Sequence, residues 1–278
     1  MISNLTLVGC IFSLLVSLIL PVALISVFAI KNKGRRVISA WWLGAAGFFV
    51  TQILIRVPIL TVLQTQPWFM DFSNHHGFLF AFSLAFTAGL FELAGRFAAA
   101  KLMQRKNNLT CTRSLAAGLG HGGIEAMVLI GITYLNNILY ILMINAGTFD
   151  SLVAEAAKTG LDVSSLWQIK DQLLNTAPIL FFLGGFERIL AMVCHMAMSM
   201  LVCCGVHTGK AGKYVLTCLG IHTMIDLTAG ISLMIGKGLS QGAAYGIIYA
   251  ILTAAAIVSI LVIRKIRQIW REMEENHV

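Results

Sequence analysis

The chain has 278 residues, of which 58% are hydrophobic and only 12% are charged, and its mean hydropathy is +0.84. This composition excludes an ordinary soluble globular domain, because long apolar stretches are typical of membrane-spanning segments. The formal net charge of +8 is explained by basic loops and does not require a nucleic-acid partner.

Apolar runs recur along the whole chain. A bilayer core about 30 Å thick requires about 20 apolar residues per helix, and no segment shows the alternating polarity of barrel strands. We therefore predict an all-α, polytopic membrane helix bundle, as one integral membrane domain over 1–278. The transmembrane helices, about seven in number, are predicted at roughly 5–30, 37–66, 77–100, 114–144, 178–206, 213–236 and 241–263.

One sizeable soluble piece is predicted, an outer loop at about 147–177. Its segment 164–174 begins with serine and continues with apolar residues at helical spacing, so we expect a short helix there.

The basic residues predict the orientation of the helices. Lysines and arginines gather after the first, third, fifth and seventh runs, at Lys31, Lys33, Arg35, Arg36, Lys101, Arg105, Lys106, Arg113, Lys210, Lys213, Arg264, Lys265, Arg267 and Arg271. The opposite side carries Lys158, Lys170 and Lys237. Because positive loops face the cytoplasm, we predict a multi-pass protein of the cytoplasmic (plasma) membrane with its N-terminus outside and its C-terminus inside.

Several ionisable residues lie within the predicted membrane helices. They are Arg56, Glu92, Arg96, His121, Glu125, Glu187, Arg188, His195, His222 and Asp226. Charged side chains are costly in the bilayer, so they usually face the bundle interior and mark a functional site. The simpler alternative is that they pair with one another and only hold helices together.

The spacing of these residues favours a site. Three different helices each carry a polar pair four residues apart, which places both members on one helix face. The pairs are Glu92–Arg96, His121–Glu125 and His222–Asp226. Arg188 and His195 lie seven residues apart, on one stripe of a fourth helix.

These residues are also expected to lie at similar depths in the membrane. Counted from the inner helix ends at 1.5 Å per residue, Glu92, His121 and His222 lie about 12–14 Å inside the boundary, and His195 lies at about 18 Å. We infer a polar pocket in the cytoplasmic half of the bundle. The glycines around His121, at 118, 120, 122 and 123, allow close approach of either a neighbouring helix or an extended peptide.

Four motifs in this order resemble those of the YhfC family of intramembrane peptidases. They are FELAGR at 91–96, GLGHGGIE at 118–125, a helix with Glu187, Arg188 and His195, and His222-x-x-x-Asp226. That family is distantly similar to the CAAX-processing and PrsW-type proteases and to the APH-1 subunit of γ-secretase. The resemblance spans about residues 85–230, which are expected to form the catalytic core.

The resemblance implies an intramembrane endopeptidase that activates water with glutamate and histidine. Phe91 stands where many CAAX-type members have the first of two glutamates, so the base is either Glu92 or Glu125. His121 and His222 would orient the water or the oxyanion, Asp226 would fix the tautomer of His222, and Arg96 would hold Glu92 ionised. His195 completes the expected catalytic set, and Glu187 and Arg188 are secondary candidates.

A metal centre is the alternative within the enzyme class. His121, His195 and His222 would then hold zinc, but each lies on a separate helix and the chain has no HExxH motif. We therefore favour a glutamic-type peptidase without a cofactor, with membrane lipids and a peptide or membrane-protein substrate as partners. The non-enzyme alternatives are a proton- or ion-coupled transporter and an inactive scaffold of the same fold.

Overall fold

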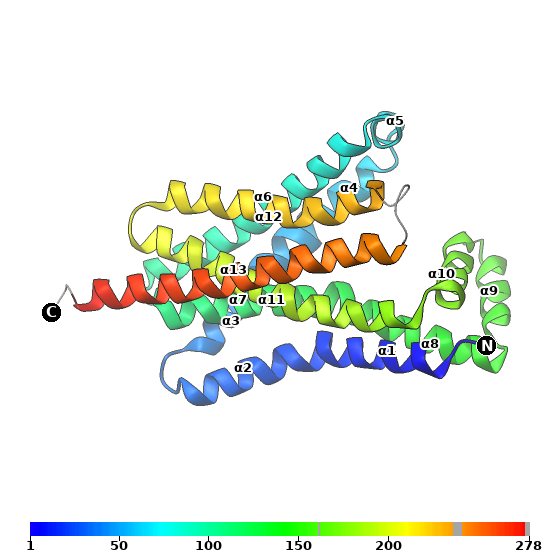
Figure 1. Cartoon of the computed structure of the whole chain (residues 1–278), viewed down its shortest axis with the longest axis horizontal. Helices are drawn as coiled ribbons and strands as arrows, with labels where there is room; N and C mark the ends of the chain where they lie inside the picture. Colours follow the sequence, from blue (N-terminus) through cyan, green and yellow to red (C-terminus); the bar gives the residue numbers. More distant parts are fainter. Residues whose placement is uncertain (161, 236–240, 276–278) are drawn as a thin grey trace. The chain divides into compact units, whose positions relative to one another are not determined.

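The computed structural model describes residues 1–160, 162–235 and 241–275, and all regular structure in this part of the chain is helical (Figure 1). The N-terminal half contains α1 (Asn4–Leu14), η1 (Leu15–Ile19), α2 (Leu20–Lys31), α3 (Val37–Phe48), η2 (Phe49–Arg56), α4 (Val57–Leu63), α5 (Pro67–His75), α6 (Gly77–Arg105) and α7 (Cys111–Glu125). The remainder contains η3 (Ala126–Gly131), α8 (Ile132–Ala146), α9 (Phe149–Lys158), α10 (Ser164–Asn175), α11 (Pro178–His207), α12 (Ala211–Ile235) and α13 (Gln241–Glu275).

Among the described residues, six helices are long and apolar enough to cross a membrane. They are Asn4–Lys31, Val37–Leu63, Gly77–Arg105, Cys111–Ala146, Pro178–His207 and Gly242–Glu275. The sixth predicted run, 213–236, forms α12 but is not one of these six. The chain is thus an all-α, multi-pass integral membrane protein, as predicted, while the direction in which it crosses the membrane stays a prediction.

Most helix limits follow the apolar runs closely, and the differences lie in polar segments. The segment at about 147–177 contains the expected short helix as α10, together with α9, which was not predicted. Helix α13 continues to Glu275, beyond the predicted limit at 263, because its charged end is still amphipathic.

Three segments, η1, η2 and η3, are π-helical turns inside longer helices. Two of them are followed by a proline: Pro21 comes shortly after η1, and Pro58 comes shortly after η2. Proline cannot donate to the carbonyl four residues earlier, and its ring crowds that carbonyl, so the preceding turn widens. Segment η3 has no proline and begins directly after Glu125.

The chain divides into two compact units, and the prediction of one domain over 1–278 stays a prediction. The first unit comprises Met1–Val22 and Ala126–Ile189. Its core includes Cys10, Ile141 and Phe181, and Ser13 of α1 donates a hydrogen bond to the carbonyl of Phe181 in α11.

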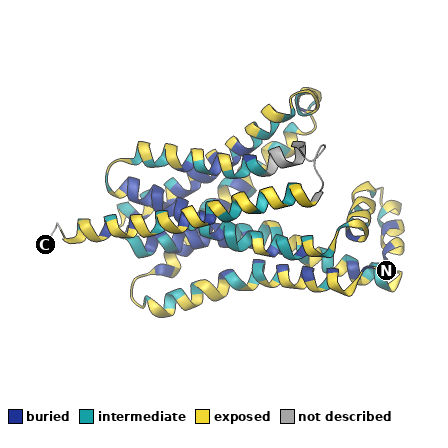
Figure 2. Ribbon diagram, in the orientation of Figure 1, coloured by how far each residue is buried: buried dark blue, intermediate teal, exposed yellow. Residues whose placement is uncertain are grey.

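The second unit comprises Ala23–Glu125 and Leu190–Val278. Helix α3 packs most extensively on α7, and α12 packs on α6. Glycine makes the first contact close, because a Cβ atom on Gly44 would collide with the backbone of Ala117. Figure 2 shows many buried residues on α3, α6 and α7. The residues described next as the centre of the site are all buried.

Candidate active site

The carboxylate of Glu92 in α6 is the centre of a buried polar cluster in the second unit. Its side chain is 7% exposed, and its Oε2 accepts hydrogen bonds from Nε2 of His121 at 3.0 Å and from Nη2 of Arg96 at 3.1 Å. The same oxygen lies 3.7 Å from Nδ1 of His195 and 3.6 Å from Nε2 of His222. Three imidazoles and one guanidinium thus surround a single carboxylate oxygen.

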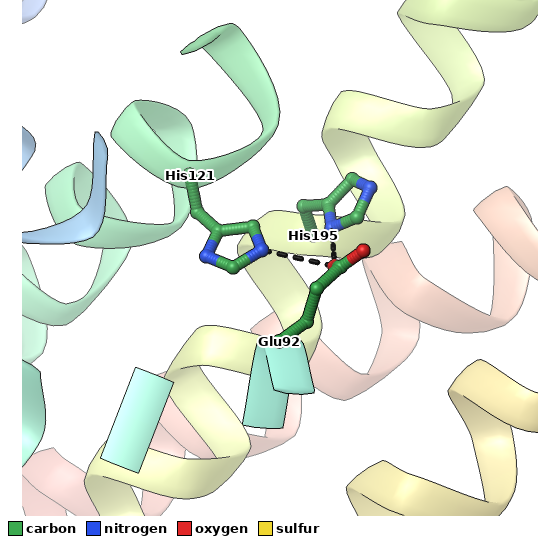
Figure 3. Close-up of side chains that lie close together, drawn as sticks. All are labelled: Glu92, His121 and His195. Atoms are coloured by element: carbon green, nitrogen blue, oxygen red, sulfur yellow. Dashed lines mark hydrogen bonds and ion pairs between the residues drawn. The ribbon is translucent and has the colours of Figure 1, made fainter. Parts of the chain in front are cut away.

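Four helices supply these side chains: α6, α7, α11 and α12. Figure 3 shows the rings of His121 and His195 turned toward Glu92 from two of them. The two rings are stacked with centroids 5.3 Å apart. One member of each predicted pair, Glu92, His121 and His222, thus lies at this common position together with Arg96 and His195.

Glycines in α7 make this geometry possible. A Cβ atom on Gly118 would lie 2.6 Å from Cα of Met196, and one on Gly122 would lie 2.9 Å from Cβ of His195. Both distances are too short for a real contact, so only glycine lets α7 approach α11 this closely. Of the two interpretations of these glycines, helix packing accounts for the positions at Gly118 and Gly122.

Arg96 determines the tautomer of His195. Its Nη2 lies 2.5 Å from Nδ1 of His195, and a guanidinium can only donate hydrogen bonds. Nδ1 must therefore accept, which leaves the ring hydrogen on Nε2. That nitrogen lies 2.6 Å from Oε2 of Glu125, so the carboxylate of Glu125 orients the ring.

His222 has a similar environment. Its Nε2 lies 3.2 Å from Oδ2 of Asp226, one turn further along α12, and its Nδ1 lies 3.5 Å from Nη1 of Arg96. Asp226 therefore lies beside the imidazole of His222, and its role in fixing the tautomer of that ring stays a prediction.

The sequence analysis missed Gln52, which is buried in η2. Its amide nitrogen donates to Oε1 of Glu92 at 2.9 Å and to the carbonyl of Ala88 at 3.1 Å. Arg56 in turn donates to Oε1 of Gln52 at 3.4 Å and to the carbonyl of Leu84 at 2.8 Å. The available signal was the four-residue spacing of Gln52 and Arg56 in an apolar helix, the same pattern that marked the other pairs.

Glu187 and Arg188 belong to the first compact unit and form an ion pair with each other. Their secondary role in the site stays a prediction.

A compact set of metal-binding atoms is present at the centre. Glu92, His121 and His195 are all buried and each offers one ligand atom, and these atoms lie within 4.8 Å of one another. Zinc with ligands at about 2.0–2.1 Å in a tetrahedron requires ligand atoms about 3.3 Å apart. The separations of 3.0 Å and 3.7 Å from Glu92 to the two histidines bracket that value.

The surroundings of His195 also fit a metal. Histidine ligands usually have a carboxylate or carbonyl beside their second ring nitrogen, and Oε2 of Glu125 lies 2.6 Å from Nε2 of His195. In this structure, the positively charged group beside Nδ1 of His195 is the guanidinium of Arg96. Compared with the three histidines proposed from the sequence, the compact set contains Glu92 in place of His222.

The fold and this cluster define a polytopic helical membrane protein with a buried centre of glutamate, histidine and arginine, and sequence comparison identifies its family. The chain belongs to the YhfC intramembrane metalloprotease family, whose sequence model matches residues 16–248. It is similar to the uncharacterized membrane protein YhfC of Bacillus subtilis (strain 168), with 28% identity over 256 residues that cover 91% of this chain and 94% of that protein. No solved structure matches the chain.

The family confirms the class predicted from the sequence motifs, an intramembrane protease in a multi-pass membrane protein. The preference for a glutamic-type enzyme without a cofactor gains no support from it, because the family is described as metalloproteases.

Proposed function

We propose that this protein is an intramembrane endopeptidase that hydrolyses a peptide bond of a membrane-embedded substrate at Glu92. The observation that carries the proposal is the convergence of His121, His195 and His222 on one carboxylate oxygen in an apolar bundle. Maintaining such a cluster in a bilayer is costly, and hydrolysis of an amide needs these groups: a proton acceptor, proton donors and a fixed cation.

Glu92 is the better candidate for the group that takes the proton from the attacking water. Its Oε2 faces all three imidazoles, whereas Glu125 contacts His195 at Nε2, the ring nitrogen turned away from Glu92. Glu125 therefore acts as a positioning residue for His195, and Asp226 does the same for His222.

Arg96 supplies the fixed positive charge. Its guanidinium donates to Glu92 and to His195 and cannot lose its proton. A donor held in place beside the carboxylate can stabilise the oxyanion that forms when water adds to the peptide carbonyl.

The family description leads us to a metal form of the proposal, with zinc as the candidate and Glu92, His121 and His195 as the residues that would hold it; Glu92 would then be a ligand and not the base. When bound, the metal would polarise the water and the substrate carbonyl. The basic residues at the inner helix ends support a site in the cytoplasmic half of the bilayer.

The test is cleavage of a fluorogenic membrane-peptide library by the purified chain in detergent. We expect the parent to cleave and Glu92→Gln to lose activity, while Glu155→Gln, which changes an exposed glutamate of α9, stays active. Loss of activity with a chelator and recovery with zinc would support the metal, and activity that is indifferent to chelator would support the glutamic type. A folded parent that cleaves nothing in the presence of zinc would contradict the proposal and favour a transporter or a scaffold.

A further inference from the structure

A second polar cavity lies at one end of the second unit, among the ends of several spanning helices. It has a volume of about 380 Å³ and is lined by residues 34–36, 107–108 and 110–113, with Glu274. These residues form the loop from α2 to α3, the loop from α6 into the start of α7, and the end of α13, which Figure 1 shows at the same end of this unit. We call this cavity the arginine pocket.

Arg113 is the most unusual member of the arginine pocket. It is only 6% exposed, and its buried Nε has no hydrogen-bond partner among the residues that the structure describes. A buried N–H of a charged group without an acceptor is unfavourable, and an external anion would supply one. Arg113 lines the cavity, so an anion bound there can reach it.

Two further arginines add to the positive charge. Arg35 donates from Nη1 to Oγ1 of Thr112 at 3.2 Å, which holds its guanidinium at the cavity wall. Arg36 lies near enough to Arg113 for the two charges to repel each other. Three arginines thus face one acid, Glu274, and the lining carries a net positive charge.

The backbone supplies donors of the same kind. Residues 110–113 include the start of α7, where the first N–H groups of a helix have no acceptor within the helix; the N–H of Arg113 donates to Oγ1 of Thr110, which leaves those of Cys111 and Thr112. They are also at the positive end of the helix dipole, where phosphate groups are commonly bound. The side chains of Asn107 and Asn108 add neutral donors.

We propose that the arginine pocket binds a phosphate group at the membrane surface. Arginine forks bind phosphate oxygens in a bidentate manner, and the combination of three arginines with a helix N-terminus suits a group with several equivalent charged oxygens. Because the pocket lies between ends of membrane-spanning helices, the phosphate group can belong either to the headgroup of an anionic phospholipid or to a soluble phosphate compound. This site is separate from the peptidase centre and does not depend on the proposed function.

The experiment measures both sources on the full chain in detergent. Native mass spectrometry counts bound phosphatidylglycerol against phosphatidylcholine, and thermal melting compares inorganic phosphate with chloride at equal ionic strength. Lipid binding that phosphate does not displace would identify the headgroup as the source. Stabilisation by phosphate without preferential binding of phosphatidylglycerol would identify a soluble compound.

Substitutions of residues that line the pocket are expected to change the affinity for the anion in opposite directions. Arg35→Gln and Arg113→Gln should each weaken binding about tenfold, because each removes charge-assisted hydrogen bonds to the anion. Glu274→Gln should strengthen binding, because it removes the one acid of the lining. Arg105→Gln, at an exposed arginine outside the lining, is the matched control and should have little effect.

Arg35 is exposed, so its substitution keeps the test valid if Arg113→Gln does not fold. The proposal is overturned if the parent binds neither phosphatidylglycerol nor phosphate. It is also overturned if Arg35→Gln and Arg105→Gln lower binding equally, since that pattern indicates a diffuse charge effect.

Discussion

Nη2 of Arg96 lies 2.5 Å from Nδ1 of His195, at the ring nitrogen that faces Glu92. The guanidinium therefore uses the lone pair that a metal ion would need. Arg96 and a metal compete for one nitrogen, and a metal bound by His195 requires the guanidinium to move away from it.

Substitution of Arg96 should therefore change metal binding. We expect Arg96→Met to bind zinc about tenfold or more tightly than the parent, because it removes both a competitor and a repelling charge, each worth on the order of 1 kcal/mol or more. The measurement is zinc competition against a chromophoric chelator, which does not depend on activity. Unchanged or weaker zinc affinity in a folded Arg96→Met protein would exclude this competition, and Arg105→Met serves as the exposed control.

Glu125 should influence the reaction through His195 alone. Glu125→Gln keeps an oxygen that can accept from Nε2 of His195 but loses the charge, so we expect a reduction of roughly 10–100-fold in kcat/KM. Glu125→Ala should be more severe, because the ring loses its acceptor. If Glu125→Gln is as inactive as Glu92→Gln, then Glu125 is the base and our assignment is wrong.

Gln52 should support Glu92 structurally. Gln52→Leu has nearly the same size but leaves Oε1 of Glu92 and the carbonyl of Ala88 without their donor. We expect a loss of about 1–3 kcal/mol in the free energy of unfolding, the usual cost of leaving a buried polar group unpaired. Gln64→Leu, at an exposed glutamine that follows α4, is the control, and equal melting temperatures for the two variants would refute the prediction.

The contact of Gly118 with α11 should be intolerant of a methyl group. Gly118→Ala places Cβ 2.6 Å from Cα of Met196, and backbone cannot yield as a flexible side chain can. We expect destabilisation of about 1–3 kcal/mol with displacement of His121 from His195. Gly220→Ala in α12 meets nothing within 4 Å and should be neutral or stabilising by up to about 1 kcal/mol. Thermal melting of both variants separates a steric effect from a general effect of alanine in a helix.

The sequence was sufficient to predict the helices and the face on which the site lies. Apolar run length gives a membrane helix its approximate limits, and spacings of four or seven residues give the face, so Glu92, His121, His195 and His222 could all be proposed together. Both criteria depend only on residues within one helix.

Contacts between helices could not be predicted in the same way. Spacing does not specify which neighbouring helix a face meets, so it did not reveal that His121 contacts Glu92 while Glu125 contacts His195. Gln52 was missed for a related reason. An uncharged amide in an apolar helix is not recognised as part of a polar site until its partner, Glu92, is known to lie opposite.

The pairing of Glu92 with Arg96 on one helix has a consequence for how the protein is made. His222, which contacts Arg96, follows it by 126 positions in the sequence, and at about 5–20 residues per second this is a delay of roughly 6–25 s during synthesis. During that interval α6 must reside in the bilayer without α12. Because the carboxylate and the guanidinium lie one turn apart, 3.1 Å from each other, the helix carries its own counterion and enters the membrane without net charge at its centre.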